Sequence, residues 1–248
     1  MRFFVGIHQP ADAHRFDRAF ISVNRLWGRK KPIEARSWIM DSGAFTTVNK
    51  HGDYPDAPEI YAAEIKRWAG GGLLAAVAQD YMCEPFVLER CGRTVGQHQA
   101  MTIARYDALV ACDTGGVYIM PVLQGYAPED YLAHLRSYGD RLAPGAWVGV
   151  GSVCKRNAQP GQVEVILRLI KAERPDLRLH GFGLKRTALE SPVVRELLDT
   201  SDSMAWSFAA RYEGRNANDW REAQRYSDNI DRLCAPRGQL SLFNWADL

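Results

Sequence analysis

The chain has 248 residues, of which 46% are hydrophobic and 24% charged, so it carries enough apolar sequence to bury a large core. We expect one domain spanning residues 1–248, because this length suits a single barrel better than two smaller domains. The formal net charge of +2 excludes nucleic-acid binding through a uniformly basic surface, so such binding would depend on local clusters. No apolar run has the length of a membrane span, and the N-terminus lacks the order of a secretory signal, so we expect a cytoplasmic protein without a membrane partner.

The cysteines are odd in number, widely spread and without a CxxC pair, so we expect reduced thiols rather than a disulfide framework. Cys83, Cys91 and His98 are an alternative as zinc ligands, but their spacing fits no standard zinc pattern. The sequence therefore favours a protein with no metal site.

Short apolar runs bounded by Gly or polar residues alternate with helical stretches, which is typical of a parallel sheet buried on both faces. Eight strands are predicted, at residues 3–7, 20–24, 37–40, 74–78, 117–123, 147–151, 177–183 and 199–203. Helices are predicted at residues 58–70, 84–109, 128–139 and 162–173, with another after Trp220 that leads into a short apolar C-terminus. This order predicts the α/β class and a (β/α)8 TIM barrel. An alternative places the last strand in the segment SMAWSFAARY, with Asp202 at its start.

A polar residue ends four of these apolar runs: Asp41, Asp80, Gln124 and Asp202. In a β/α barrel the carboxyl ends of the strands meet on one face, so these side chains are expected to converge there. Polar groups inside the barrel would instead be left unpaired at a cost in free energy. Converging carboxylates predict acid/base chemistry.

The segment that follows Asp41 favours binding of a planar ligand. Gly43 permits a sharp turn at the strand end, and Phe45 then falls where its ring can stack on a base. The alternative is a turn in which Asp41 bonds its own backbone and Phe45 belongs to the core.

Four further positions suit a purine. Asp80 can accept two hydrogen bonds from a guanine-like edge, and Gln124 offers both a donor and an acceptor. Gly149 and Gly151 leave space for a flat ligand to approach backbone amides, although glycines in strands also mark barrel corners.

Together these segments resemble, in order, the motifs of the tRNA-guanine transglycosylases. They are DSGAF at 41–45, QD at 79–80, PVLQG at 121–125, GVGS at 149–152, HGFG at 180–183 and DSMAW at 202–206. The short length and the DSMAW form look closest to the DpdA branch, the DNA-guanine transglycosylases that install 7-deazaguanines in phage and bacterial DNA. The resemblance implies a (β/α)8 barrel that exchanges bases by double displacement and needs no cofactor.

The resemblance also assigns roles. Asp202 matches the nucleophile that forms a glycosyl-enzyme intermediate, and Asp41 matches the general acid/base. The remaining matches are in purine binding: Phe45 as the stacking aromatic, Asp80 and Gln124 at the purine edge, Gly149 and Gly151 beside the backbone that meets the carbonyl, and Ser42 within the same DSGAF motif.

Departures from the tRNA-modifying relatives favour DNA as the polymer. Those relatives carry a zinc subdomain with a CxCxxC run, and only Cys234 lies in the corresponding region here. Their proline-threonine-arginine segment after the nucleophile is also missing, with Arg211 and Arg215 as substitutes. Other cations that follow strands, and so are expected to contact phosphates, are Lys155, Arg156, Lys185 and Arg186.

The leading hypothesis is a DNA-guanine transglycosylase, a pentosyltransferase whose incoming base is free preQ0 or a related 7-deazaguanine. A minimal tRNA-guanine transglycosylase is the alternative with the same chemistry. A non-catalytic subunit that binds nucleic acid or scaffolds a partner is the alternative from another class, and a nucleoside hydrolase is a more distant one. The sequence leaves open whether a helicase-like partner exposes the base.

Overall fold

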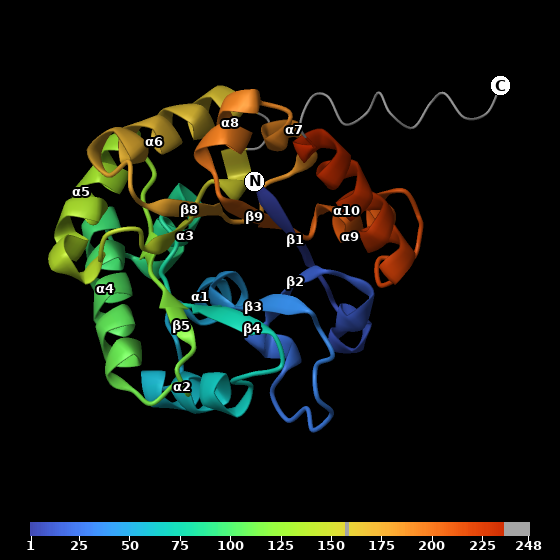
Figure 1. Cartoon of the computed structure of the whole chain (residues 1–248). Coiled ribbons are helices and arrows are strands. Elements are labelled where there is room, and N and C mark those ends of the chain that lie inside the picture. The colour runs from blue at the N-terminus through green and yellow to red at the C-terminus, as the bar shows by residue number, and fades with distance from the viewer. Residues whose placement is uncertain (157–158, 236–248) are drawn as a thin grey trace.

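The computed structural model describes residues 1–156 and 159–235 and shows a nearly closed barrel of parallel strands surrounded by helices (Figure 1). The sheet order is β5-β4-β3-β2-β1-β9-β8-β7-β6. The strands are β1 (Arg2–Gly6), β2 (Arg18–Ser22), β3 (Ser37–Asp41), β4 (Leu73–Val77), β5 (Tyr118–Met120), β6 (Val122–Leu123), β7 (Trp147–Val150), β8 (Arg178–Gly181) and β9 (Thr200–Ser203). The predicted TIM-like barrel is confirmed.

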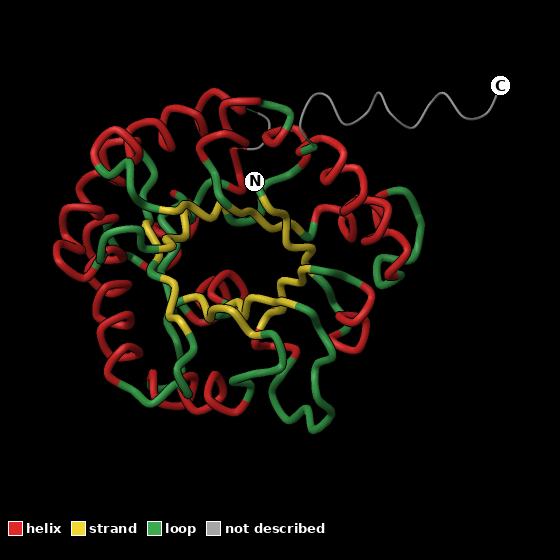
Figure 2. Tube along the Cα trace, viewed as in Figure 1, coloured by secondary structure: helices red, strands yellow, loops and turns green. Residues whose placement is uncertain are grey.

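The predicted strand at 117–123 is divided at Pro121 into β5 and β6, which gives nine strands in place of the predicted eight. Proline has no N–H to contribute to a ladder, so pairing changes partner at this residue. β5 pairs with β4, whereas β6 pairs with β7. This one run of chain therefore joins the two ends of the sheet and completes the ring that Figure 2 shows.

The helices are α1 (Ala44–His51), α2 (Pro58–Arg67), α3 (Pro85–Cys91), α4 (Val95–Ala111), α5 (Pro128–Tyr138), α6 (Pro160–Glu173), α7 (Arg186–Leu189), α8 (Pro192–Leu197), α9 (Ala205–Tyr212) and α10 (Trp220–Cys234). Most of the helices surround this ring, whereas α1 is seen across its opening in Figure 1. Single 3-10 turns are η1 (Pro10–Arg15), η2 (Val23–Arg25), η3 (Gly139–Arg141) and η4 (Cys154–Arg156). None of the described helices is long and apolar enough to cross a membrane.

One predicted helix and one alternative strand need correction. The single helix expected at 84–109 is two helices, because Gly92 ends α3 in the left-handed conformation with φ +62° and Thr94 starts α4 with a capping box to Gln97. The alternative that placed the last strand in SMAWSFAARY is wrong, since most of that segment forms α9 and Asp202 lies within β9. The predicted helix after Trp220 is α10, and the apolar segment beyond it lies outside the described residues.

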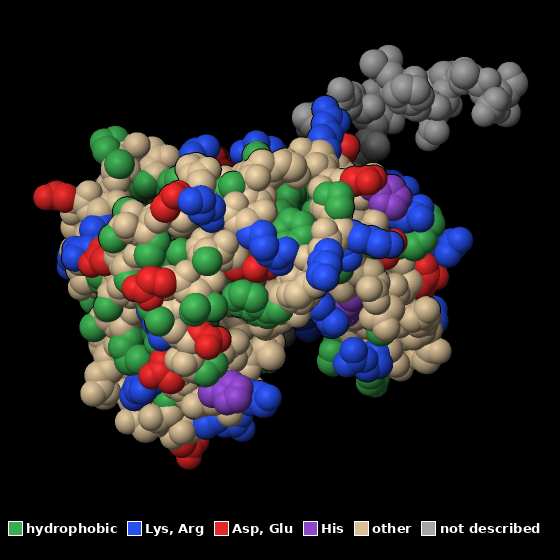
Figure 3. Space-filling model, turned by 90° about the horizontal axis from the view of Figure 1, so that it is seen from below, with side chains coloured by type: hydrophobic (Ala, Val, Ile, Leu, Met, Phe, Trp, Pro, Cys, Tyr) green, Lys and Arg blue, Asp and Glu red, His purple; other side chains and the backbone are tan. Residues whose placement is uncertain are grey.

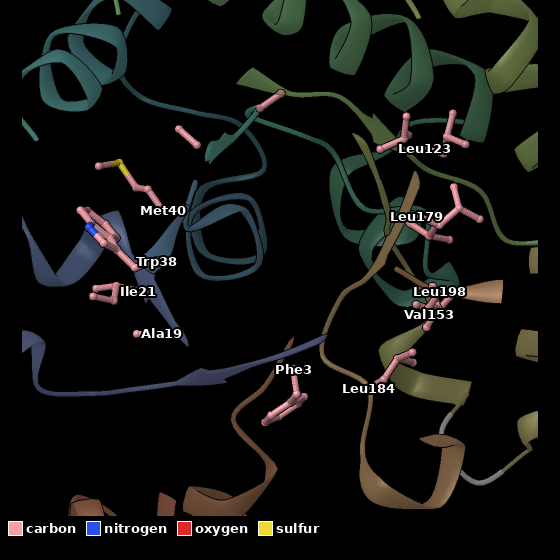
Figure 4. Close-up of a cluster of buried hydrophobic side chains, with 14 of the residues drawn as sticks. Phe3, Ala19, Ile21, Trp38, Met40, Leu123, Val153, Leu179, Leu184 and Leu198 are labelled. Carbon is pink, nitrogen blue, oxygen red and sulfur yellow. The ribbon is translucent and has the colours of Figure 1, made fainter. Parts of the chain in front are cut away.

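Strand alternation separates two apolar layers. On β3, Trp38 and Met40 point outward and pack with Ala19 and Ile21 of β2 beneath the helices (Figure 4), whereas Ile39 faces the barrel interior. The interior cluster is formed by Phe4, Phe20, Ile39, Ala75, Val77, Met120, Val122 and Trp147.

The same alternation places polar side chains directly above this interior cluster. Ser22 and Asp41 are paired neighbours on β2 and β3, two residues beyond Phe20 and Ile39. Asp202 lies two residues beyond the buried Thr200 on β9. The polar layer therefore closes the barrel at the carboxyl ends of its strands.

Gly149 offers a test of the packing inside the barrel. A Cβ at this position would lie 2.2 Å from the Phe182 ring, which is itself held against His180 with ring centroids 4.7 Å apart. We expect Gly149→Ala to lower the free energy of unfolding by about 1 to 3 kcal/mol through overpacking. The control is Gly96→Ala on α4, where a Cβ meets nothing within 4 Å and helix propensity predicts a gain of up to about 1 kcal/mol. Urea denaturation measures both, and equal stabilities would contradict this packing.

Candidate active site

A cavity of about 680 Å³ opens at the carboxyl ends of the strands. Most residues predicted for catalysis or purine binding line it, from widely separated parts of the chain: Asp41, Phe45, Asp80, Gln124, Gly151 and Asp202. Further lining residues that the sequence analysis did not select include His8, Ser22, Arg25, Glu84, Ser152 and Phe182. The convergence expected from the barrel is present.

Asp80 and Gln124 form the polar end of this cavity. Asp80 is only 6% exposed, and its carboxylate accepts hydrogen bonds from the Gln124 amide and, at 3.4 Å, from the Ser42 hydroxyl. The Gln124 Oε1 faces the Ser152 hydroxyl at 2.7 Å, so the orientation of the amide is fixed from both sides. Burial, opposed by the Gln124 bond and assisted by the Asp41 charge, raises the pKa of Asp80 to about 7.

Ser152 connects this end to a second carboxylate, that of Glu84. Ser152 has a φ of 53°, which is unusual for a residue with a side chain, and its Oγ accepts from the Cys83 backbone N–H at 3.0 Å. The same hydroxyl lies 2.9 Å from Glu84 Oε2, and Glu84 is 2% exposed. The only local signal for Glu84 was its place after Asp80 and before Pro85, which also reads as an ordinary helix start.

The DSGAF segment contains the turn of the alternative interpretation but not its buried Phe45. The Asp41 carboxylate does accept a hydrogen bond from the Gly43 backbone at 3.1 Å, and Gly43 has the left-handed φ of +72° that this turn requires. Phe45, however, does not belong to the core, since it is 45% exposed and lines the cavity. Burial and the nearby charge of Asp202 raise the pKa of Asp41 to about 6.

Asp202 lies on the opposite side of the cavity and is 5% exposed. Its Oδ1 accepts a hydrogen bond from the Gly183 backbone N–H at 3.0 Å and lies 3.3 Å from His180 Nε2. His180 is fully buried, and its Nδ1 lies 2.9 Å from the Thr200 hydroxyl. The HGFG segment was noticed as a motif, but nothing local in it indicated a contact with Asp202.

Gly149 lies on β7 and Gly151 directly follows it, and the predicted reason for glycine at these positions needs correction. Neither leaves open space for a flat ligand: a Cβ at Gly151 would lie 2.2 Å from the Gln124 amide nitrogen, and one at Gly149 would meet Phe182. Gly149 is also absent from the cavity wall, and so is Ser42, which supports Asp80 from behind. These glycines make room for side chains of the site.

Among the described side chains, none of the predicted phosphate-contacting cations is part of the cavity wall. Two of them are held by carboxylates: Arg186 by Glu190 at 3.1 Å, and Arg215 by Glu213 at 2.6 Å. Figure 3 shows acidic and basic side chains interspersed over one face of the molecule, as the balanced net charge predicts.

The other predicted cations have varied surroundings. The Arg156 guanidinium lies 4.6 Å from the Tyr126 ring centroid and Lys185 Nζ lies 5.6 Å from that of Phe208, whereas Arg211 is exposed. The side chain of Lys155 lies outside what the structure describes. Arg25, which the sequence analysis did not select, lines the cavity and contacts His8 Nδ1 at 3.3 Å.

The zinc alternative gains no support from the described residues, among which no three potential metal ligands form a cluster. His98 Nδ1 lies 2.7 Å from the Met82 carbonyl, and Cys83 Sγ contacts the Tyr81 carbonyl at 3.8 Å. These side chains take part in local packing.

Comparison with protein families decides the relationship. The family model for DpdA, DeoxyPurine in DNA protein A, matches residues 1–219. The chain belongs to the DpdA family. No curated protein matches the sequence. DpdA membership confirms the resemblance drawn from the motifs and identifies a DNA-modifying, transglycosylase-like protein whose substrate is DNA.

The raised pKa of Asp80 predicts a pH-dependent stability. The folded state binds a proton more tightly than the unfolded state, whose carboxyl has its ordinary pKa of 3.8, so wild-type stability should fall as the pH rises from about 4 to 7. Asp80→Asn should therefore be more stable than wild type at pH 8 and lose this advantage by pH 4, with about 1.4 kcal/mol for each unit of pKa shift.

Urea unfolding at these two pH values measures the difference. The control is Asp176→Asn, because the hydrogen bond from Arg174 lowers the pKa of that exposed carboxyl and its loss should reduce stability at pH 8. A difference between Asp80→Asn and wild type that stays constant with pH would contradict the raised pKa.

Proposed function

We propose that this protein exchanges guanine in DNA for a 7-deazaguanine such as preQ0, by double displacement through a covalent glycosyl-enzyme intermediate. The observation that carries the proposal is the arrangement of three aspartates around one cavity, each with different hydrogen-bond partners. Asp202 and Asp41 are near enough for the charge of one to raise the pKa of the other, and Asp80 faces Gln124 at the polar end.

In the first displacement, Asp202 is the nucleophile. A carboxylate oxygen forms a bond to C1′ of the deoxyribose, the bond from C1′ to the guanine nitrogen breaks, and that nitrogen takes the electron pair. In the second, the nitrogen of the incoming base bonds to C1′ and the carboxylate leaves with its electron pair. Two inversions retain the configuration at C1′, which a single displacement would not do.

Asp41 is the proposed general acid/base. The leaving guanine needs a proton, and the incoming base must lose one, so a single group can serve both steps in turn. A pKa of about 6 allows Asp41 to hold or release that proton near neutral pH. Its bond from the Gly43 backbone fixes the direction of the carboxylate.

Purine recognition is assigned to the other end of the cavity. Asp80 and Gln124 present acceptors and donors toward an edge that guanine and 7-deazaguanines share, and Phe45 offers an exposed ring for stacking. A volume of about 680 Å³ lies within the range of small-molecule sites, roughly 300 to 1,000 Å³, and suits a base with its sugar. A paired guanine would have to leave the duplex to reach it, which is where a helicase-like partner would act.

Asp202→Asn tests the chemistry. We expect the variant to fold, to bind free guanine, and to lose exchange of labelled guanine completely, because an amide cannot form the covalent intermediate. Wild-type protein incubated with DNA should yield a protein–DNA adduct that survives denaturation and is absent from Asp202→Asn. Unchanged exchange by this variant would refute the nucleophile, and a wild-type protein without exchange on any polymer would favour the non-catalytic alternative.

The second test concerns the polymer. Arg211→Ala should weaken DNA binding across all sequences and should reduce the slope of log K against log salt by about 0.9. Arg186→Ala is the matched control, since Glu190 already pairs with that guanidinium and the expected effect is smaller. Fluorescence anisotropy at several salt concentrations measures these slopes.

A parallel exchange assay compares duplex DNA, single-stranded DNA and tRNA. We expect exchange in DNA and little in tRNA, and we expect chelators to have no effect. Exchange into tRNA alone would support the minimal tRNA enzyme instead.

A further inference from the structure

A chain of buried hydrogen bonds ends on Asp202. The Trp147 indole N–H donates to Thr200 Oγ1 at 2.8 Å, the same hydroxyl lies 2.9 Å from His180 Nδ1, and His180 Nε2 lies 3.3 Å from Asp202 Oδ1. Trp147 is 8% exposed, and both Thr200 and His180 are fully buried. The chain runs from the interior core of the barrel to the layer of the cavity.

The direction of each bond follows from the chemistry of the groups. An indole N–H can only donate, so Thr200 Oγ1 accepts from Trp147 and is free to donate its own proton to His180 Nδ1. An ionised carboxylate can only accept, so His180 must carry its proton on Nε2 to bond Asp202. One tautomer, with the proton on Nε2 and with Nδ1 as the acceptor, satisfies both contacts at once.

The packing around His180 holds the ring in one orientation. Phe20 stacks on it with centroids 5.6 Å apart and planes at 13°, and Phe182 contacts it edge-on at 4.7 Å. His180 is not among the described residues that line the cavity. It therefore does not contact a substrate held there. An effect of His180 on the chemistry is thus indirect, and its hydrogen-bonding contact in the cavity wall is Asp202.

The two carboxylate oxygens of Asp202 differ in their hydrogen-bond partners. Oδ1 is held by His180 Nε2 and by the Gly183 backbone N–H, whereas no hydrogen bond to Oδ2 is found within the described residues. We propose that His180 is a positioning residue: it fixes Oδ1 of Asp202 and so leaves Oδ2 as the oxygen that attacks C1′. In the covalent intermediate Oδ1 becomes the ester carbonyl oxygen and keeps both bonds, and no proton moves along the chain.

This inference rests on the proposed function for its chemical part, so the experiment has two readouts. The first needs no substrate. Long-range proton–nitrogen NMR of the full-length protein reports the tautomer of each histidine, and His180→Gln identifies the signal among the six histidines. We expect the proton of His180 on Nε2. A proton on Nδ1 would overturn the inference whatever the activity.

The second readout is the rate of adduct formation with DNA. His180→Phe keeps an aromatic ring in place but removes the donor, and it should slow adduct formation by about 10- to 100-fold while binding of free guanine stays unchanged. His180→Gln places an amide N–H near the position of Nε2 and should recover most of that loss. His98→Phe is the control for replacing another fully buried histidine, remote from Asp202, and should keep the wild-type rate.

The outcomes separate the two proposals. A wild-type rate in His180→Phe, or equal losses in His180→Phe, His180→Gln and His98→Phe that follow their thermal stabilities, would overturn the positioning role. The Nε2 tautomer in a wild-type protein that forms no adduct would overturn the proposed function alone and leave the hydrogen-bond chain in place.

Discussion

Strands of the barrel alternate their side chains between an inner and an outer layer, and the rest of the site depends on this alternation. Large apolar residues such as Phe4, Phe20 and Trp147 fill the interior. Two residues further toward the carboxyl end of a strand, the next side chain that points inward can be polar. The apolar interior packs beneath this side chain, and the cavity lies above it. Asp41 and Asp202 occupy such positions, so the same rule that builds the core also delivers the carboxylates to one face.

Within that layer, three residues of one type have different chemistry because their partners differ. Asp80 accepts a hydrogen bond from the side-chain amide of Gln124. Asp41 accepts one from the backbone of a turn and lies near the negative charge of Asp202. One oxygen of Asp202 is held by a histidine and by a backbone N–H. Burial favours protonation of Asp80 and Asp41, whereas two donors hold a single oxygen of Asp202. In the proposed function, these different surroundings allow identical side chains to serve as acid, base and nucleophile near neutral pH.

The sequence predicted the strands and the strand-end carboxylates, because apolar runs and the residues that end them are local patterns. It missed His180, Glu84 and Ser152, since their importance comes from partners 22 to 69 residues away that only the barrel register brings together. It also misjudged Gly149 and Gly151, because a glycine reveals missing volume but not the side chain that fills it. The sequence analysis predicted that Arg186 contacts phosphate and did not consider its ion pair with Glu190, which lies one helical turn away.

At Pro121 the two edges of the sheet are joined by continuous chain rather than by strand pairing, and the Asp80–Gln124 end of the cavity lies at this seam. On one side of it Ala78 N–H bonds the Met120 carbonyl, and on the other Gly151 N–H bonds the Leu123 carbonyl. The Asp80–Gln124 hydrogen bond bridges the same junction through side chains. A purine that inserts between Asp80 and Gln124 would replace the hydrogen bond that connects the two edges of the sheet. Binding of a purine should therefore change the rate of hydrogen exchange at the Ala78 and Gly151 amides.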